Sequence, residues 1–560
     1  MRRLLGIPAL TTAALTAAVT LYVVFTLPPR AVALDDSIPD TIAVGAYHVH
    51  TDRSDGTGSV EEVAAAASRA GLSFVVLTDH GDGTRAPDAP SYLHGVLVID
   101  AVELNTSAGH VVALGLTQAA PYPLAGHPRD VIEDIRRLGG AAVIAHPDSP
   151  NPALRWRGQN VAADGIEWLN VDSEWRDDRP ARLVATAIRS LIRGPEAIAS
   201  LFSRPAATLA RVDAAARQRP TFTLAALDAH ANIGWRDTEE PRQHSLIARP
   251  TYEAMFRTVA QAVVLDTPLS KNPTDDAASI LGALTHGRSF SIVRAFAEPA
   301  ALNFLADRGT EQASMGGRLS IAALPTTFRA SVPQAPGARI ALLANGRSIA
   351  AGQGSLEHDT AGEPGVYRIE VGFPGADAPW IVSNPIVVAP SLPAPPDPTD
   401  ESGQILPLPT TSGTWTIEHE PTSSGTVTAD GTSLRFSFSL APGVPRGQYA
   451  ALAVPVTTAS GIDHVQLEGR ASRPMRVSLQ LRLPGGPDGR RWRRSVYLDE
   501  TPRTITASLQ DFDPVEPYTS QRPVVSPIQT LLVVVDTVNA LPGTDGVIWI
   551  ANVALGIRQP

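Results

Sequence analysis

The sequence predicts a multi-domain protein in which an α/β domain is followed by two all-β sandwich domains. At 560 residues the chain is too long for one hydrophobic core. From Thr41 to about Phe296, apolar runs typical of buried strands alternate with helical patterns, which predicts a largely parallel sheet, open or closed into a barrel. After residue 300 the helical patterns give way to short alternating strands separated by turn residues, a pattern typical of β-sandwiches.

Residues 1–33 have the features of a targeting segment. Arg2 and Arg3 precede an uncharged apolar stretch, Leu4–Leu27, and acidic residues follow soon after it. This order of charges predicts that the body of the chain lies on the far side of the membrane from the N-terminus. The stretch is long enough to span a bilayer as one helix, and Ala31–Ala33 also fits a small-x-small cleavage site. We therefore expect an extracytoplasmic protein (periplasmic, cell-surface or secreted), and the sequence leaves a cleaved signal peptide and a retained N-terminal membrane anchor open.

The α/β domain is expected at 41–300, beginning with a strand at Thr41–Tyr47. The helix that follows, at 59–71, opens on a capping box of Ser59 and Glu62, and Gly71 is a natural stop. The remaining expected elements are strands at 72–80, 96–104 and 110–116, a helix at 128–140, strands at 141–147 and 164–170, a helical region from about Pro180 to Arg217, and a strand at 221–230.

Two β-regions are expected after the α/β domain. Residues 301–390 contain short alternating strands with Gly, Asn and Pro turns, which predicts a small Ig-like β-sandwich. Residues 391–410 are rich in proline and polar residues and are expected to form a linker. From 411 to 560 the β-runs have almost no helical pattern between them, which predicts a jelly-roll sandwich.

Composition excludes several classes of function. The net charge of −10 and the pI near 5.7 leave no basic footprint, so we predict no nucleic-acid partner. The chain has no cysteine, so neither a thiolate metal site nor a cysteine nucleophile is possible. Any metal must be held by His, Asp and Glu, a ligand set that suits Zn, Mn or Fe.

Imidazoles and carboxylates recur at the ends of the predicted strands. In parallel α/β folds these ends share one face, where ligands bind. Residues i and i+2 of a strand point the same way, so the HVH and DAH motifs should each deliver a matched pair, whereas Asp52 and Asp79 are expected to orient neighbouring groups. One such motif alone is also common in solvated loops. A whole series of imidazoles and carboxylates after buried strands instead indicates a bound cation, because a cation offsets the free energy of removing these groups from water. The predicted metal ligands are His48, His50, Asp55, His80, Glu103, His110, His146, Asp228 and His230.

The segments that carry these residues resemble a known family. HVHTDRSDG, LTDHGD, AVELNTSAGHVVALGL, GGAAVIAHPD and ALDAHAN are similar to the successive motifs of the PHP (polymerase and histidinol phosphatase) family, and most similar to its exported carbaryl-hydrolase-like branch. The resemblance covers 41–300. It implies a distorted (β/α)7 barrel that holds two or three divalent metal ions, Zn, Mn or Fe.

The resemblance also implies how the ligands are shared among the ions. It groups His48, His50, Glu103 and Asp228 around a first ion, Glu103, His110 and His146 around a second with Glu103 as the bridge, and Asp55, His80 and His230 around a third. The last β-region resembles a galactose-binding jelly roll on strand pattern alone, which makes a glycan a possible partner there.

These expectations lead to three hypotheses about function. The first is an exported metal-dependent phosphoesterase that acts on a small-molecule ester, with Glu103 at the metals and His230 or His80 as the proton donor. The second is hydrolysis of a carbamate, amide or carboxylic ester by the same centre. The third is a surface carbohydrate-binding protein with a relict barrel. Arg155, Arg157 and Arg236 follow ligand motifs and are either substrate contacts or ordinary surface arginines.

Overall fold

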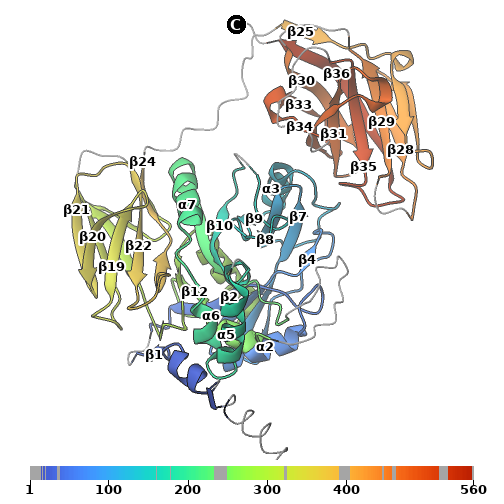
Figure 1. Ribbon diagram of the computed structural model, residues 1–560. Coiled ribbons are helices and arrows are strands. Elements are labelled where there is room, and N and C mark those ends of the chain that lie inside the picture. The colour runs from blue at the N-terminus through green and yellow to red at the C-terminus, as the bar shows by residue number, and fades with distance from the viewer. Residues whose placement is uncertain are drawn as a thin grey trace, which may run out of the picture. The chain divides into compact units, whose positions relative to one another are not determined.

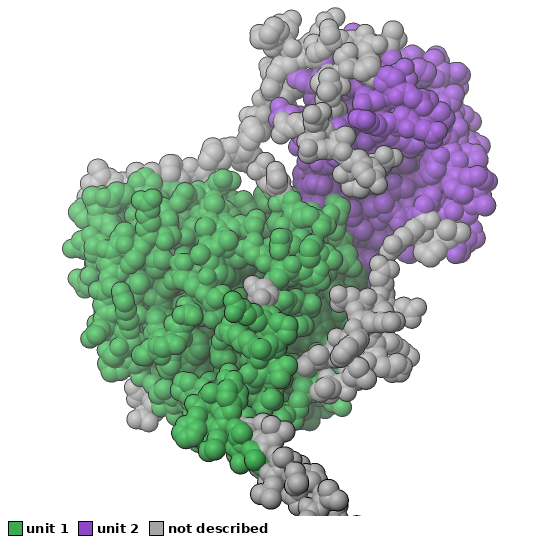
Figure 2. All heavy atoms as spheres, viewed as in Figure 1, with its two compact units in different colours: residues 1–81, 87–118, 135–392 green, residues 82–86, 119–134, 393–560 purple. Residues whose placement is uncertain are grey.

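The structure is a computed structural model whose chain divides into two compact units, and each is described by itself (Figure 2). Unit 1 comprises residues 1–81, 87–118 and 135–392, and unit 2 comprises 82–86, 119–134 and 393–560. The residues described are 14, 17–18, 20–34, 38–158, 161–176, 178–232, 249–320, 325–389, 404–443, 447–456, 462–515 and 528–557.

Unit 1 is built on a ring of strands (Figure 1). In order around the ring they are β2 (Ile42–Val49), β3 (Phe74–Leu77) running on into β4 (His80–Gly81), β6 (Val96–Asp100) running on into β7 (Val102–Thr106), β8 (Gly109–Leu114), β9 (Ala141–Ile144), β10 (Gly165–Asn170) and β11 (Phe222–Ala226). All neighbouring pairs from β2 to β6 and from β9 to β11 are parallel, and β8 alone runs antiparallel to both of its neighbours.

Hydrogen bonds join the two sheets of the ring at both of their edges. On one side the amide of Ala101 donates to the carbonyl of Leu77 (2.8 Å), so the pairing of β3 with β6 continues into that of β4 with β7. On the other side the amide of Leu227, just after β11, donates to the carbonyl of Tyr47 in β2 (3.0 Å). One apolar cluster fills the interior with side chains from both sheets, including Phe74 and Phe222. The predicted sheet is therefore closed.

Helices and short strands surround the ring. The helices are α2 (Val60–Arg69), α4 (Val171–Glu174), α5 (Pro180–Ser190), α6 (Gly194–Ala199), α7 (Ala206–Gln218), α8 (Tyr252–Phe256) and α9 (Pro273–Thr285), while α3 (Pro128–Arg137) belongs partly to unit 1 and partly to unit 2. The additional strands are β1 (Val32–Ala33), β5 (Ser91–Leu93), β12 (Ala260–Val264), β13 (Ser289–Ile292) and β14 (Ala297–Glu298). The α2 capping box is confirmed, with Ser59 and Glu62 each accepting from the other's backbone amide. The predicted helical region after Pro180 is three helices, because Pro195 and Pro205 cannot continue a helix.

Residues 301–389 do not form a separate body. Their strands are β15 (Asn303–Arg308), β16 (Glu311–Ser314), β17 (Arg318–Ser320), β18 (Thr326–Ser331), β19 (Arg339–Ala344), β20 (Arg347–Gln353), β21 (Ser355–Thr360), β22 (Gly365–Gly372), β23 (Ile381–Ser383) and β24 (Ile386–Ala389). Strand β23 pairs with β13, so the sheet runs on from β2 and β12 into this region. Phe290 and Phe328 share one apolar cluster. The expected boundary at residue 300 is thus crossed by both a sheet and a core.

Unit 2 consists of two antiparallel sheets with strands of one lying against strands of the other. One sheet contains β25 (Gln404–Pro407), β27 (Ser424–Asp430), β28 (Ser433–Ser439), β30 (Ile462–Ala471), β33 (Arg503–Ser508) and β36 (Asp545–Ile557). The other contains β26 (Thr416–His419), β29 (Tyr449–Pro455), β31 (Met475–Arg482), β32 (Arg491–Leu498), β34 (Asp513–Pro514) and β35 (Thr530–Asp536). Strand β25 lies inside the expected linker 391–410 and pairs with β36, so that part of the linker is sheet.

Part of the segment between β8 and β9 also belongs to unit 2. Residues 119–134, including the first turns of α3, group with the C-terminal sandwich and not with the ring that precedes them in the sequence. The sequence gives no local sign of this. Within the described residues no helix is both long and apolar enough to cross a bilayer. Of the expected targeting segment 1–33, most residues before Thr20 lie outside the described ones.

Candidate metal centre

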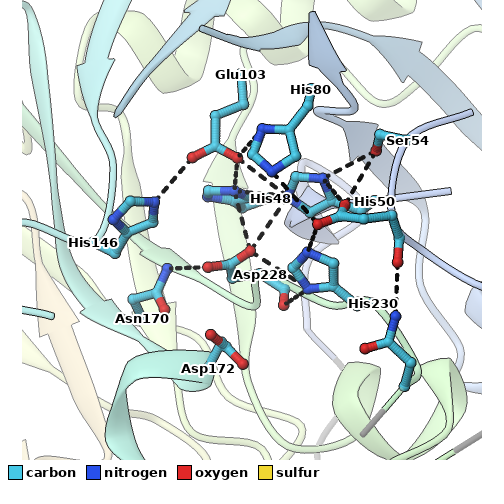
Figure 3. Close-up of polar contacts among 12 residues, drawn as sticks. His48, His50, Ser54, His80, Glu103, His146, Asn170, Asp172, Asp228 and His230 are labelled. Atoms are coloured by element: carbon cyan, nitrogen blue, oxygen red, sulfur yellow. Dashed lines mark hydrogen bonds and ion pairs between the residues drawn. The ribbon is translucent and has the colours of Figure 1, made fainter. Parts of the chain in front are cut away.

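The predicted metal ligands lie together at one end of the ring, and Figure 3 labels His48, His50, His80, Glu103, His146, Asp228 and His230 among them. His48 and His50 are at the end of β2, His80 is in β4, Glu103 in β7 and His110 in β8. His146 follows β9, whereas Asp228 and His230 follow β11, and Asp55 lies in the loop after β2. The contacts described below join all nine side chains into one cluster.

The histidine pair of β2 converges for a different reason from the one predicted. The register of β2 against β3 shifts between Tyr47 and Val49, so His48 is the extra residue of a bulge. Its φ of 65° lies in the left-handed region, which non-glycine residues rarely occupy. The simple i, i+2 alternation is therefore wrong here. The bulge turns the His48 ring toward His50, with 3.1 Å between their Nε2 atoms.

Two other predicted ligands share this unusual backbone. Asp228 has a φ of 51° and His146 a φ of 30°. Each lies two residues after the end of a ring strand, β11 for Asp228 and β9 for His146. Left-handed conformations at non-glycine residues cost free energy and persist only where the surroundings enforce them, and they gather at functional sites. Three such residues meeting in one cluster indicate a site shaped for its side chains.

Glu103 lies at the centre of the cluster and is 1% exposed. Its Oε1 is 2.9 Å from His110 Nδ1 and 2.9 Å from His146 Nε2. Its Oε2 faces three other imidazoles, His48 (3.2 Å), His50 (3.3 Å) and His80 (3.4 Å). Figure 3 shows His146 on one side of this carboxylate and the other labelled rings on the opposite side. The two oxygens thus serve two different sets of nitrogen atoms.

Outer hydrogen bonds fix how two of these rings present their nitrogens. Nδ1 of His48 lies 2.6 Å from Glu167 Oε1, and because a carboxylate only accepts, this nitrogen carries the proton. Nδ1 of His146 donates in the same way to the carbonyl of Leu154 (3.0 Å). In a neutral ring the remaining Nε2 then carries a lone pair, which in both cases points at Glu103. Each inner contact therefore joins two acceptors unless a second proton or a metal ion lies there.

Asp228 and His230 are also held by an outer hydrogen bond on one side and face another member of the cluster on the other side. Oδ1 of Asp228 faces His48 Nε2 (3.4 Å) and His50 Nε2 (3.3 Å), and its Oδ2 accepts from the side chain of Asn170 (3.2 Å). Nδ1 of His230 donates to the backbone carbonyl of Asp228 (2.9 Å), which leaves its Nε2 facing Asp55 Oδ2 at 3.2 Å. The His230 ring stacks on that of His50, with 4.2 Å between ring centroids.

The cluster has a buried floor and a more open mouth. His48, His50 and Glu103 are essentially inaccessible. The side chain of Asp55 is 40% exposed and that of His80 is 30% exposed. Both nitrogen-bearing sides of the His80 ring face carboxylates, since its Nε2 lies 3.6 Å from Asp55 Oδ2. Asp55 and His80 are therefore the members of the cluster that are most accessible from solvent.

Electrostatics in the cluster favour negative carboxylates surrounded by positive charge. Burial raises the pKa of Glu103, but the imidazoles of His48, His80 and His110 outweigh it and hold this pKa well below its usual range. Burial lowers the pKa of His146, yet the Glu103 carboxylate outweighs it and raises that pKa to about 9. The buried carboxylates thus require positive charge in the middle of the cluster, either as protons on the rings or as metal cations.

Three sets of donor atoms lie close enough together to hold an ion, and they agree only in part with the grouping that the family resemblance implies. The sets are His50, Asp55, His80 and His230; His48, His50 and Asp228; and His80, Glu103 and His110. The difference lies in four side chains: His50 also joins the set at the mouth, His80 also joins that of Glu103, Glu103 is absent from the set of His48 and Asp228, and His146 reaches Glu103 without entering a set.

The candidate substrate contacts are not brought into the cluster. Arg155 donates to the backbone carbonyls of Ser149 and Pro150, and Arg157 donates to those of Pro152 and Ser107. Both guanidinium groups are thus used to hold the loop that follows His146. The third candidate, Arg236, lies outside the described residues.

Sequence reasoning missed the groups that orient the ligands, apart from Asp79. That carboxylate accepts from Thr51 and from Ser54 and so shapes the loop after β2, as expected. Glu167 and Asn170 were not predicted, although both are buried and touch ligands or each other. The one available sign was a glutamate in the middle of an apolar strand, GIEWLN, where a carboxylate is costly unless it has a partner.

Comparison with known proteins gives a relative for part of the chain. No family model matches it. Over 138 residues it is 33% identical to "Uncharacterized protein MJ1587" of Methanocaldococcus jannaschii, an alignment that covers 22% of this chain and 79% of that protein. Over this stretch the chain belongs to the same family as the archaeal protein, whose name assigns no activity.

Solved structures that match part of the chain include carbohydrate-binding modules. One is the family 11 module from Clostridium thermocellum in complex with a β-1,3-1,4-mixed-linked tetrasaccharide, at 13% identity over 27% of this chain and 94% of that one, with a TM-score of 0.23. Another is a family 29 module complexed with mannohexaose, at 9% identity over 28% of this chain and 92% of that one, with a TM-score of 0.19. TM-scores this low support no argument about fold or function.

Proposed function

We propose that this protein is a metal-dependent hydrolase whose active site is the cluster around Glu103. One observation carries the proposal: the two oxygens of a buried carboxylate face separate sets of imidazole nitrogens, and in neutral rings of His48 and His146 the outer hydrogen bonds direct the Nε2 lone pairs inward. Acceptors that face acceptors in a buried site are unstable unless a cation lies between them. Imidazole and carboxylate ligands are those that Zn, Mn and Fe accept.

The residues present fit two or three divalent ions. The floor set of His48, His50 and Asp228 and the set of His80, Glu103 and His110 share the Glu103 carboxylate as their common neighbour. The third set lies at the mouth, around Asp55 and His230. When bound, divalent ions in such a site lower the pKa of water and stabilise the charge that develops in a displacement reaction.

The side chains at the mouth are placed to handle a proton and to orient the substrate. Nε2 of His80 and Nε2 of His230 both face Asp55 Oδ2. Where no ion is bound to His80, burial lowers the pKa of this ring, but the carboxylates of Glu103 and Asp55 outweigh it and raise the pKa, so that the ring could give a proton to a leaving oxygen. His230 is held by its bond to the Asp228 carbonyl, which fixes Nε2 as the atom that faces the mouth.

A phosphate ester is the proposed substrate, on the strength of the motif resemblance to the PHP family. The closed ring of strands with its ligands at one end is compatible with the barrel that this resemblance implies. A carbamate, amide or carboxylic ester is the alternative for the same centre, because the same side chains would serve any hydrolysis of that kind. We further propose an extracytoplasmic location, from the N-terminal sequence.

A protein of another class is the competing proposal, namely a surface carbohydrate-binding protein with a relict ring. The complete set of ligands in the cluster argues against it, because a site without a task is under no constraint to keep strained backbone at His48, His146 and Asp228. Unit 2 could still bind a glycan while the ring performs hydrolysis.

The decisive experiment combines elemental analysis with a substrate screen on the full chain. Metal content per chain would be measured for the wild type, for Glu103→Gln and for Asp52→Asn. Asp52 is an exposed carboxylate of the loop after β2, the loop that also carries Asp55, and its variant is the matched control. The three proteins would then be assayed with Mn or Zn on phosphomonoesters, phosphodiesters and aryl esters.

The expected result is bound metal and ester hydrolysis in the wild type and the control, and loss of both in Glu103→Gln with the fold retained. Preference for phosphate over carboxylic esters would separate the first two hypotheses. A wild-type chain that takes up no divalent ion, or a Glu103→Gln variant with full turnover, would refute the proposal. Glycan binding without metal would favour the relict ring.

A further inference from the structure

We propose that the exposed apolar face of α5 and of the turn after it lies on a lipid bilayer, beside the N-terminal helical stretch of the chain. This inference is independent of the hydrolase proposal. Among the exposed large apolar side chains of the described residues, eight fall in two short segments. These are Leu21, Tyr22, Val24 and Phe25 in the first segment, and Val184, Ile188, Leu191 and Ile192 in the second.

Helix α5 presents its apolar side chains outward. Val184, Ile188 and Leu191 are spaced by four and three residues, so they share one helix face, and Val184 and Leu191 are 60% and 65% exposed. The side chain that the helix buries is Thr186. A surface helix of a water-soluble domain has the opposite arrangement, with its apolar stripe toward the core. This helix is therefore built for apolar surroundings on its outer side.

The N-terminal stretch is fastened to this same end of unit 1. The Arg189 guanidinium of α5 donates to the Thr26 hydroxyl (3.2 Å), and the backbone amide of Ala31 donates to Glu196 Oε1 of α6 (3.2 Å). Arg193 donates to the carbonyl of Pro28. Figure 1 shows the dark-blue stretch next to β1 leaving unit 1 beside α5 and α6.

The sequence before this stretch identifies the occupant as lipid. Leu4–Leu27 carries no charge and is long enough to cross a bilayer, and the described part of that run shows Phe25 to be 83% exposed. Where such a segment leaves a bilayer, the protein surface beside it meets the headgroups and the outer acyl chains. The patch on α5 adjoins that exit point, so the same bilayer covers it.

The charge pattern of α5 also suits a membrane surface. From Arg179 to Arg193 the chain contains four arginines and no acidic residue, interleaved with the apolar positions. Interfacial helices combine an apolar face with an excess of basic charge that attracts anionic headgroups. Arg182 also pairs with Asp178, and Arg189 and Arg193 also hold the N-terminal stretch. A soluble protein partner would not require this combination next to a bilayer-length apolar segment.

The absence of cysteine from the chain allows a direct test. A single cysteine would be introduced at Leu191, and in a matched control at Ile349, an exposed apolar residue of β20 that is 40% accessible. Val184→Cys would serve as a second position on the α5 face. Each full-length protein would be labelled with an environment-sensitive fluorophore and reconstituted into phosphatidylcholine vesicles with and without phosphatidylglycerol, some of them carrying brominated acyl chains.

The expected result is a blue shift of the label at Leu191 and at Val184 in vesicles, with strong quenching by the brominated lipid, and neither effect at Ile349. Equal, weak quenching at all three positions would overturn the proposal. A blue shift at Leu191 in lipid-free detergent solution that depends on protein concentration would also overturn it, in favour of a second copy of the chain as the occupant. Neither result depends on hydrolytic activity.

Discussion

Both compact units bury charged side chains, but they compensate the charge in opposite ways. In unit 2, Arg476 is 1% exposed and donates to the Asp134 carboxylate (2.7 and 3.0 Å) and to Glu133 (3.1 Å). Its remaining donors reach the backbone carbonyls of Asp130 (2.8 Å) and Ser495 (3.2 Å). Every nitrogen of this guanidinium has an acceptor, so the group is satisfied by the protein alone.

The cluster in unit 1 has the opposite character. In neutral rings of His48 and His146 the inward Nε2 atoms would present lone pairs to the Glu103 carboxylate, and both histidines have left-handed backbone. Donors are what this site lacks. Protons on the rings would supply them, as the raised imidazole pKa values indicate, and so would metal ions.

The comparison teaches that buried charge alone does not mark a functional site. A buried cluster whose donors and acceptors match needs no ligand, and its role is structural. Removing one charged partner lowers the stability of the fold because the other stays buried and unpaired, whereas replacing both by apolar residues changes the stability little. A buried cluster with an excess of acceptors requires a ligand.

The largest effect is expected at the self-contained cluster of unit 2. Arg476→Met leaves the buried Asp134 carboxylate without the guanidinium that neutralises it, although the Tyr122 hydroxyl still donates to it, so the free energy of unfolding of unit 2 should fall by about 3–5 kcal/mol. Urea unfolding followed by hydrogen exchange on unit 2 peptides measures it. The double variant Arg476→Met/Asp134→Leu should recover most of the loss. A single variant as stable as the wild type would show that the pairing does not matter.

Metal loading should produce the next largest effect, and only in unit 1. An ion that binds the folded state alone stabilises it by about 3–4 kcal/mol when its free concentration is a few hundred times Kd. Hydrogen exchange should therefore slow in the ring strands when Zn or Mn is added and recover with a chelator. Peptides of the Arg476 cluster should not change. Equal protection in both units would contradict the distinction.

Glu167→Gln tests the outer hydrogen bond of His48. The amide can still lie beside Nδ1 but loses the negative charge that orients the ring, so metal affinity should fall by about 10–100-fold, the usual effect of losing an outer partner. Competition titration with a metal-sensitive dye gives the Kd. Asp172→Asn is the control, because this nearby carboxylate pairs with Arg176 and contacts no predicted ligand. An unchanged affinity in Glu167→Gln would mean that the outer bond is not used.

The sequence predicted those parts of the fold and site that are local. Strands that end in ligating residues, such as the ones before His146 and Asp228, are visible because apolar runs and polar ends are adjacent in the chain. The capping box at Ser59 is equally local. These features depend on a few neighbouring residues, so a pattern reveals them.

The remaining features depend on contacts between distant residues. Glu167 meets His48 across 119 positions, and the bulge that turns His48 arises from its pairing with β3. The pairing of β13 with β23, which carries the sheet past residue 300, joins segments about ninety positions apart. The grouping of 119–134 with the C-terminal sandwich depends on partners such as Arg476 and Asp134. None of these has a signature within a short window.

The smallest expected effect separates the scaffold from the charged cluster. Ser59 caps α2, the helix that begins just after the ligand loop carrying Asp55, and Ser59→Ala removes a side chain that accepts from the Glu62 amide. Losing such a cap costs about 1 kcal/mol of stability. Because the cap touches no ligand, urea unfolding should show this loss while the Kd for Zn or Mn stays unchanged. A weaker Kd in Ser59→Ala would mean that the loop geometry depends on the helix start, and that the metal centre is less self-contained than its contacts indicate.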